Sequence, residues 1–434
     1  MKQIFSQKAG IRRLIKSEFF KNAATLVTGA SMAQLIPMLI SPILSRLYLP
    51  HDFGTVALFL AITGFISIIV TGQYESAIML PKSDNEAINI VVLGGIITVI
   101  ISVLCLILFI LFGNLICRIF ENADLYYYLF LVPFSVFLTG IYQIFNFWAI
   151  RKKKFKRIAI RQVSQAVSSS SVKLGYGIIN PISAGLIIGN IGGQLLATSV
   201  LVGLTLREEK NLFSLVNKEK IKNVASKFQN FPKYIAPQAF LDTLNASSII
   251  FILGYFYSNT ILGLYSFAFG MVTLPMKLIG TSLSQVFYQK ASEAFNDGKA
   301  LWPITKKMLT RLSLIGIPSF LVIIFIGPSL FSIVFGGRWH DAGIYAQILM
   351  PWIYLVFIGS PIANLSSILG KQKGFFTLTL IGNLGMPIIL FCFSILNNQI
   401  TYLLFLMSFL GCIYYFIAIM WIRSITKIND VKKN

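Results

Sequence analysis

The sequence predicts an all-α polytopic membrane protein, with about twelve transmembrane helices in two six-helix bundles around a central cavity. The 434-residue chain is 56% hydrophobic and only 12% charged, which is more apolar surface than a single soluble core buries. Its apolar runs are roughly 20 residues long, the length that crosses about 30 Å of hydrocarbon. Its basic residues gather in alternate connections between these runs.

The expected spans follow from the apolar runs and the polar breaks between them. They are 25–47, 54–80, 87–113, 126–149, 158–180, 182–206, 231–256, 261–285, 309–336, 342–368, 375–397 and 400–423. Grouped into domains, they give a basic arm (1–24), an N-terminal lobe (25–206), an inter-lobe loop (207–230), a C-terminal lobe (231–423) and a tail (424–434). The arm lacks the features of a cleaved secretory signal, so we expect the first helix to be retained.

The placement of charge gives the chain an orientation. Most of the 37 Lys and Arg residues lie in the arm, in the connections on one side and in the tail, whereas the other side holds only Arg46, Arg118 and Arg338. By the positive-inside rule, the arm, the inter-lobe loop and the tail are cytoplasmic. We therefore expect a multi-pass protein of the bacterial inner membrane with both termini cytoplasmic. This placement also explains the net charge of +22 without a nucleic-acid partner.

A weak internal repeat relates the two lobes. At an offset of 209 positions, Tyr48 and Gly54 align with Tyr257 and Gly263, in the outer turn between the first two helices of each lobe. Because six helices return the chain to its starting side, the two lobes run parallel, as in transporters with two lobes around a cavity.

Polar residues inside the expected spans are the candidates for function, because charge is costly in hydrocarbon. The substrate-binding candidates are Lys173, Lys277, Arg46, Gln238 and Asn245, and the ion-coupling candidates are Asp242 and Glu75. Helical spacing places many of these side chains on polar stripes, including Ser67, Thr71 and Glu75 on the second expected helix.

Such stripes indicate a hydrated cavity. Lysines facing it would suit an anionic cargo, since an ammonium group binds phosphate as a point charge. Two other interpretations stay open. Small polar residues also let helices pack closely, and a buried lysine can form an ion pair, for example Lys277 with Asp242.

No catalytic or metal-binding motif accompanies these residues. The chain has no P-loop, H-E-x-x-H or G-x-S-x-G motif, and its four cysteines and two histidines are not spaced as metal ligands. We therefore expect a protein that is not an enzyme and uses no cofactor. The basic run RKKKFKR at 151–157 is typical either of topology or of a contact with anionic lipid headgroups.

Several stretches resemble the polysaccharide-transport branch of the multidrug/oligosaccharidyl-lipid/polysaccharide exporter superfamily, the O-antigen and capsular repeat-unit flippases. They are residues 19–59, 71–87 (TGQYESAIMLPKSDNEA), 147–160, 278–298 and 336–372, and the resemblance runs along almost the whole chain. The family pattern is matched at Gly72, Tyr74, Glu75 and Pro81, and again at Gln285, Phe287, Lys290 and Ala291.

The resemblance implies two six-helix bundles that open alternately inward and outward. It implies as cargo an oligosaccharide repeat unit of O-antigen, capsule or exopolysaccharide, linked to undecaprenyl pyrophosphate, that is moved from the cytoplasmic to the outer leaflet by an ion gradient. Membrane lipids and the polysaccharide polymerase or chain-length machinery are the other partners it suggests. Two alternatives are a drug or cation exporter of the same superfamily and a polysaccharide polymerase or ligase, which would need a larger outer loop than GNLICRIFENADL.

Overall fold

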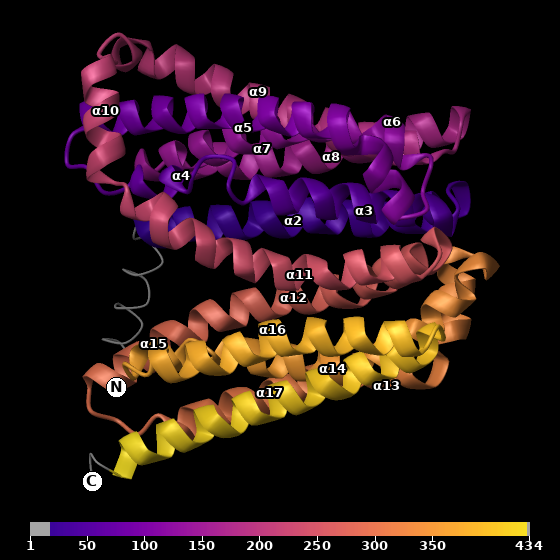
Figure 1. Ribbon diagram of the computed structural model, residues 1–434. Coiled ribbons are helices and arrows are strands. Elements are labelled where there is room, and N and C mark those ends of the chain that lie inside the picture. The colour runs from indigo at the N-terminus through magenta and orange to yellow at the C-terminus, as the bar shows by residue number, and fades with distance from the viewer. Residues whose placement is uncertain (1–17, 432–434) are drawn as a thin grey trace. The chain divides into compact units, whose positions relative to one another are not determined.

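The computed structural model describes residues 18–431, which form helices and no strand (Figure 1). Most of the predicted arm (1–24) therefore lies outside the described residues. The elements are α2 (Glu18–Leu47), α3 (Pro50–Ser67), α4 (Tyr74–Ala77), α5 (Asp84–Ile119), α6 (Leu125–Leu129), α7 (Val132–Arg151), α8 (Phe155–Ile179), α9 (Ser183–Phe213), α10 (Lys218–Lys227), η1 (Phe231–Ile235), α11 (Ala236–Phe256), α12 (Asn259–Asn296), α13 (Trp302–Phe335), η2 (Gly337–Trp339), α14 (His340–Gly359), η3 (Ser360–Ile362), α15 (Leu365–Ile368), α16 (Gln372–Leu396) and α17 (Ile400–Val431).

Ten helical segments among the described residues are long and apolar enough to cross a membrane. Two further helices, α3 of 18 residues and α8 of 25 residues, stand where the second and fifth spans are expected. Helix α8 carries glutamines, serines and a lysine in place of apolar residues, and α3 begins with Pro-His-Asp. Together these helices agree with the prediction of about twelve spans, and the all-α polytopic fold class is confirmed.

The chain divides into two compact units. Unit 1 contains residues 1–40, 59–118 and 122–243, and unit 2 contains residues 41–58, 119–121 and 244–434. The C-terminal end of α2 and the N-terminal part of α3 (residues 41–58), which are expected in the N-terminal lobe, thus belong to unit 2.

The second expected helix, 54–80, is wrong at its C-terminal end. Helix α3 ends at Ser67, and the chain then turns before the four-residue helix α4. Gly72 and Gln73 both have a φ of 61°, a left-handed conformation that does not continue an α-helix. The expected stripe through Glu75 therefore does not lie along one continuous helix, because Glu75 belongs to α4.

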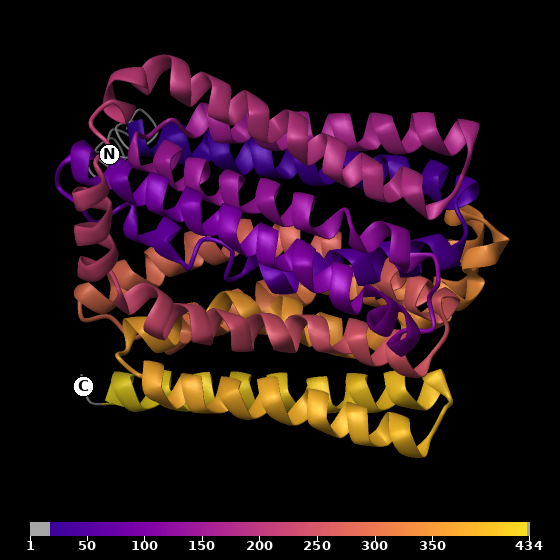
Figure 2. The same ribbon diagram turned by 45° about the horizontal axis from the view of Figure 1, so that its top comes forward.

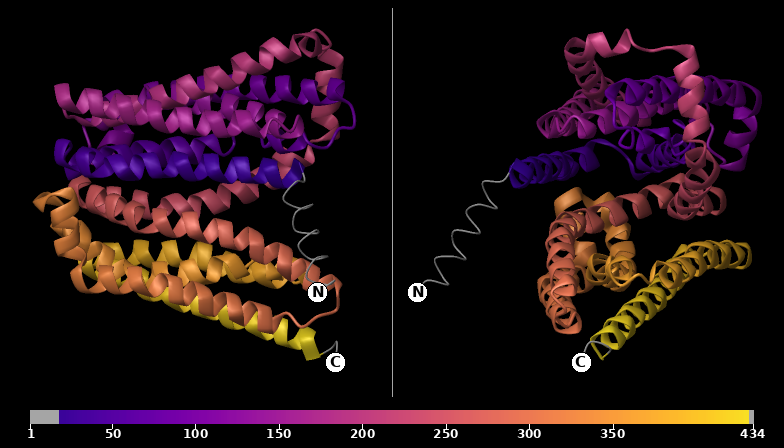
Figure 3. Two further views of the ribbon diagram at one scale, coloured as in Figure 1. Left: turned by 180° about the vertical axis from the view of Figure 1, so that it is seen from behind. Right: turned by 90° about the vertical axis from the view of Figure 1, so that its left-hand side faces the viewer.

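Two other connections are more helical than expected. Most of the expected inter-lobe loop (207–230) is helix: α9 extends to Phe213, and α10 occupies Lys218–Lys227. Figure 3 shows α10 lying across the ends of the long helices of unit 1 rather than along them. The expected tail is also mostly helix, since α17 extends to Val431. The tenth expected span, 342–368, lies within the candidate membrane span Gly337–Ile368. Its helix is not uniform, because α14 ends at Gly359 and the chain continues through η3, which contains Pro361, to α15.

The end of unit 1 that is predicted to be cytoplasmic is held by one apolar cluster. Trp148 of α7 packs there with Ile88 of α5 and Tyr74 of α4. Helix α10 contributes Val224, which is 3% exposed, and the Tyr74 hydroxyl donates to the carbonyl of Ala225 at 3.1 Å. These contacts fix the short helices α4 and α10 against the long ones.

The basic run at 151–157 is engaged in ion pairs at this same end. Asp84 accepts from Arg151 at 3.0 Å and from Lys152 at 2.5 Å, and Lys152 also lies 3.4 Å from Glu209. Burial lowers the pKa of the Lys152 ammonium, but its hydrogen bond to Asp84 and its attraction to Glu209 outweigh burial and raise that pKa above 10.5. The run thus ties α7 to α5 and α9.

In unit 2, helix α14 packs against α12, α13 and α17. Helices α16 and α17 form an antiparallel pair joined by a short turn (Figure 2). At the predicted outer end, Trp339 is fully buried between Phe53 and Phe267, with ring centroids 5.1 and 4.1 Å away. Its indole nitrogen donates to the carbonyl of Ser45 at 2.8 Å, so η2 is fixed to the end of α2.

Candidate substrate-binding sites

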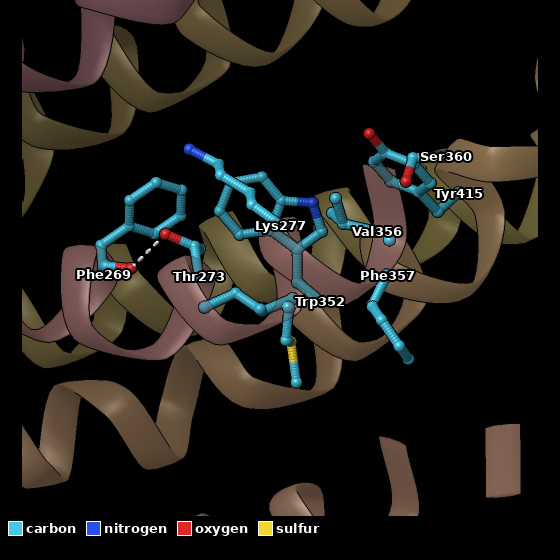
Figure 4. Close-up of a pocket in the computed structure, with 11 residues that line it drawn as sticks. Phe269, Thr273, Lys277, Trp352, Val356, Phe357, Ser360 and Tyr415 are labelled. Carbon is cyan, nitrogen blue, oxygen red and sulfur yellow. Dashed lines mark hydrogen bonds between the residues drawn. The ribbon is translucent and has the colours of Figure 1, made fainter. Parts of the chain in front are cut away.

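Unit 2 contains a pocket of about 210 Å³ beside Lys277. Helices α12, α14 and α17 and the 3-10 turn η3 build it. Its wall is mostly apolar and includes four aromatic rings, and its polar side-chain groups include the Lys277 ammonium and the hydroxyls of Thr273, Ser360 and Tyr415. Figure 4 shows the nitrogen of Lys277 on the Phe269 side of the pocket, with Ser360 and Tyr415 at the other end. The sequence-predicted residue Lys277 thus lies in a cavity that has polar groups at both ends.

Aromatic stacking sets the wall of this pocket. Tyr265 stacks on Phe269 with centroids 5.8 Å apart, and Phe269 stacks on Trp352 at 5.9 Å. Trp352 can occupy its position because α17 has Gly411 beneath the indole: a Cβ there would lie 2.5 Å from the indole Cγ. The Thr273 hydroxyl donates to the Phe269 carbonyl at 2.7 Å, one helical turn back, which fixes its rotamer beside Lys277.

Unit 1 contains a second pocket, of about 340 Å³, beside Lys173. It lies between α2, α8 and α9, and its polar lining is Gln34, Gln162, Gln165, Ser169, Lys173 and Asn190. Glycines on α9 allow α8 to approach closely: a Cβ at Gly193 would lie 2.7 Å from the Cβ of Ser169, and a Cβ at Gly189 would overlap the side chain of Lys173. The close packing of α8 on the glycines of α9 therefore keeps Lys173 half-buried at the pocket wall.

A cluster of polar side chains on α7 and α8 was not predicted. One of its members, Gln162, also lines the Lys173 pocket. Arg161 is only 6% exposed and stacks on the ring of Tyr142, with its guanidinium carbon 3.4 Å from the ring centroid. Arg161 lies within the expected span 158–180 but is not among the candidate residues predicted from the sequence. Within the described residues, the side-chain oxygens of Gln143, Asn146 and Gln162 are buried and accept no hydrogen bond.

A signal for this cluster is present in the sequence. Ser135, Thr139, Gln143 and Asn146 recur on α7 at spacings that share one helix face. The Gln194 amide of α9 donates to Thr139 at 2.7 Å, so part of that stripe joins α7 to α9. The remaining part, at Gln143 and Asn146, has side-chain oxygens that accept no hydrogen bond from the described part of the chain, and it is the part suited to water or a polar ligand.

The other sequence-predicted residues do not line these two pockets. Arg46 is exposed and donates to the carbonyls of Pro42 at 2.9 Å and Ile333 at 3.0 Å, and the Asn245 amide donates to Asn383 at 3.0 Å. Gln238 and Asp242 are exposed on α11. Glu75 is 5% exposed in α4, and its carboxylate accepts from the Thr71 hydroxyl.

Helices of membrane-spanning length and a polar pocket within each compact unit define a polytopic membrane protein with two candidate binding sites. Among the described residues, no group of three or more His, Cys, Asp and Glu side chains is placed to hold a metal ion. The comparisons with known proteins identify the family within this class.

The chain belongs to the polysaccharide biosynthesis protein family, whose model matches residues 43–343, more than half of the sequence. It is 25% identical over 391 residues to the capsular polysaccharide biosynthesis protein CapF of Staphylococcus aureus, covering 87% of this chain and 91% of CapF. The family resemblance expected from the sequence is therefore confirmed.

Solved structures show the same fold. An inward-facing multidrug resistance MATE family transporter of the MOP superfamily matches 93% of this chain and 95% of its own, with a TM-score of 0.70 and 13% identity. A MOP superfamily transporter from Pyrococcus furiosus, described as having a binding pocket of reverse polarity, matches 96% and 98% with a TM-score of 0.59 and 12% identity. The chain thus has the two-lobed helical fold of this superfamily, as predicted.

Proposed function

We propose that this protein is a flippase that moves undecaprenyl-pyrophosphate-linked oligosaccharide repeat units from the cytoplasmic to the outer leaflet by alternating access. Its membrane would be the bacterial inner membrane, with both termini cytoplasmic, as the basic connections predict. The observation that carries the proposal is the Lys277 pocket, in a chain that belongs to a polysaccharide biosynthesis family.

The composition of that pocket suits a sugar phosphate. The Lys277 ammonium would pair with a phosphate oxygen, and the faces of Phe269 and Trp352 would stack against the apolar face of a sugar ring. The hydroxyls of Ser360 and Tyr415 would exchange hydrogen bonds with sugar hydroxyls. A polyprenyl tail has no place in a pocket of about 210 Å³ and would stay in lipid.

Unit 1 supports the proposal with a second set of polar groups. The Lys173 pocket offers its own ammonium group to an anionic group, and the buried oxygens of Gln162 and Asn146, which accept no hydrogen bond within the described residues, would accept from sugar hydroxyls or water. Arg46, Gln238 and Asn245 remain proposed substrate contacts, and Asp242 and Glu75 remain the proposed carriers of the coupling ion. Membrane lipids and the polymerase or chain-length machinery remain proposed partners.

A cellular experiment tests this function. A strain lacking the gene should accumulate lipid-linked repeat units on the inner leaflet, and the wild-type chain should restore surface polysaccharide. Lys277→Ala should fail to restore it while reaching the membrane at the wild-type level. Lys306→Ala is the matched control, since Lys306 is exposed on α13 and lines neither pocket. Normal surface polysaccharide with Lys277→Ala, or no accumulation in the deletion strain, would contradict the proposal.

The aromatic wall also suits the alternative, an exporter of aromatic cations. Lys277 disfavours it, because an ammonium group at the pocket repels a cation. Resistance to cationic dyes on expression, with no change in polysaccharide, would favour this alternative.

A further inference from the structure

Unit 2 contains another groove, of about 610 Å³, that shares no residue with the Lys277 pocket. It lies between the C-terminal part of α12 and the N-terminal part of α13, near the connection that is predicted to be cytoplasmic. Residues of one face of each helix line it. The lining residues on α12 and beyond it are Leu283, Val286, Phe287, Lys290, Glu293, Ala294, Asp297 and Lys299, and those on α13 are Pro303, Ile304, Lys307, Met308, Arg311 and Ile315.

The lining is arranged in three levels along the helix axes. Helix α12 runs toward the predicted inner side and α13 runs back, so residues at similar distances from the connection lie at similar depths. The deepest level is apolar, with Leu283, Val286 and Ile315. The middle level is cationic, with Lys290 and Lys307 and, one helical turn deeper, Arg311; the level nearest the connection adds the carboxylates of Glu293 and Asp297 and the ammonium of Lys299.

The middle level is available to an anion. Lys290, Lys307 and Arg311 are exposed and form no ion pair within the described residues. The fourth cation, Lys299, is bound to Asp297 at 2.8 Å. Glu293 accepts a hydrogen bond from Gln289 at 3.0 Å and keeps its other oxygen for a further donor.

We propose that this groove is a docking site for the polyprenyl-pyrophosphate-linked sugar on the cytoplasmic side, occupied before the substrate reaches the transport pathway. The tail would lie along Val286 and Ile315, and the pyrophosphate would bind Lys307 and Arg311, the latter in a bidentate manner. The first sugar would donate hydroxyl hydrogen bonds to Glu293. The inference rests on the proposed function, since it assigns a place to the same substrate.

The carboxylates distinguish this substrate from an ordinary anionic phospholipid. A phospholipid has a tail and a phosphate, which match the two deeper levels only. Asp297 is paired with Lys299, but the carboxylate of Glu293 would repel an additional negative headgroup, whereas it would accept hydrogen bonds from neutral sugar hydroxyls. The order of apolar, cationic and carboxylate levels therefore matches tail, pyrophosphate and sugar.

Binding to the full chain in phosphatidylcholine nanodiscs tests the site, with undecaprenyl pyrophosphate and its N-acetylglucosamine derivative as probes and native mass spectrometry as the readout. The double variant Lys307→Ala/Arg311→Ala should weaken binding of both probes about ten- to a hundredfold. Lys306→Ala, next in sequence and outside the groove, should bind like the wild type. Glu293→Gln should weaken binding of the sugar-bearing probe more than that of the sugar-free one.

Unchanged binding by the double variant would overturn the site, as would equal competition by phosphatidylglycerol. Arg311→Lys, which keeps the charge, guards against a folding defect: it should bind more tightly than Arg311→Ala. Lys277→Ala separates this inference from the proposed function, because it should lose transport and keep groove binding. Groove variants that lose binding but export normally would overturn the docking role and leave the flippase function standing.

Discussion

Gly54 of α3 and Gly263 of α12 lie against each other in unit 2, so closely that a Cβ on Gly263 would stand 2.8 Å from the backbone nitrogen of Gly54. The contact is reciprocal. A Cβ on Gly54 would overlap the carbonyl of Asn259, and a Cβ on Gly263 would overlap the carbonyl of Pro50. Both pairs, Gly54 with Gly263 and Pro50 with Asn259, are separated by the offset of 209 that aligns the two halves of the sequence. The contact therefore joins equivalent positions of the two sequence repeats, and its reciprocal form gives it local two-fold symmetry.

This crossing predicts that a methyl group is not tolerated at either glycine. Gly54→Ala and Gly263→Ala should each lower the free energy of unfolding by about 1–3 kcal/mol or more, since the colliding atoms are backbone. Thermal unfolding in detergent measures this. Gly64→Ala, on the same helix with no atom within 4 Å of its Cβ, is the control and should be neutral or stabilising. Equal melting temperatures for Gly54→Ala and Gly64→Ala would contradict the close contact.

The Trp339 anchor gives a second prediction. Because the side chain is fully buried among phenylalanines, Trp339→Ala should cost about 3–5 kcal/mol of stability. Trp339→Phe keeps most of the packing and loses the hydrogen bond to Ser45, so it should cost about 1 kcal/mol. Phe325→Ala is the control, since Phe325 is 76% exposed in the structure. A loss with Phe325→Ala as large as that with Trp339→Ala would refute the anchor.

Gly411 links packing to the Lys277 pocket. In Gly411→Ala the new methyl group should displace the Trp352 indole, which lines the pocket, and export should fall while the protein still reaches the membrane. Gly385→Ala on α16, where a Cβ meets nothing within 4 Å, should leave export unchanged. Polysaccharide at the cell surface and protein in the membrane fraction are the two measurements. Wild-type export by Gly411→Ala would show that the position of Trp352 is not needed.

The ion pairs of Lys152 predict a dependence on pH. Because the folded protein raises the pKa of Lys152, the pairing stabilises the fold at neutral pH and is lost as the pH rises beyond 10.5. Lys152→Met should therefore cost about 1 kcal/mol at pH 7 and progressively less above pH 10.5, since the site is partly exposed. Lys156→Met, an exposed neighbour, should have no effect at either pH. A cost of Lys152→Met that does not change with pH would contradict the ion-pair account.

The fold was predictable because a bilayer imposes span length and charge placement on the sequence, and both can be read without a structure. The break at Gly72 and Gln73 was missed because Ser67, Thr71 and Glu75 recur across it at helical spacing, whereas the turn depends on two left-handed residues. Helix α10 was missed because the sequence of a short amphipathic helix resembles that of a polar loop. Its apolar face is recognised only from the contacts of Val224 with the apolar cluster.

The candidate sites were partly predictable. Lys173 and Lys277 each line a pocket, as their place on a polar stripe suggests. The aromatic wall at Trp352 and Tyr415 was not predicted, because aromatic residues in an apolar span carry no period that separates a pocket from a lipid-facing surface. Arg161 was not predicted as a candidate, because its burial against Tyr142 depends on how α7 and α8 pack, and it lies close to a basic run that topology explains.

Transport by the purified protein tests the central claim most directly. The full chain would be reconstituted in proteoliposomes with an undecaprenyl-pyrophosphate-linked, labelled oligosaccharide, and the appearance of the sugar on the opposite leaflet would be followed by its accessibility to an added lectin. The wild-type chain and Lys306→Ala should both move the sugar, and Lys277→Ala should leave it at the rate of protein-free liposomes. Movement by Lys277→Ala at the wild-type rate, or none by the wild type under any imposed ion gradient, would contradict the account.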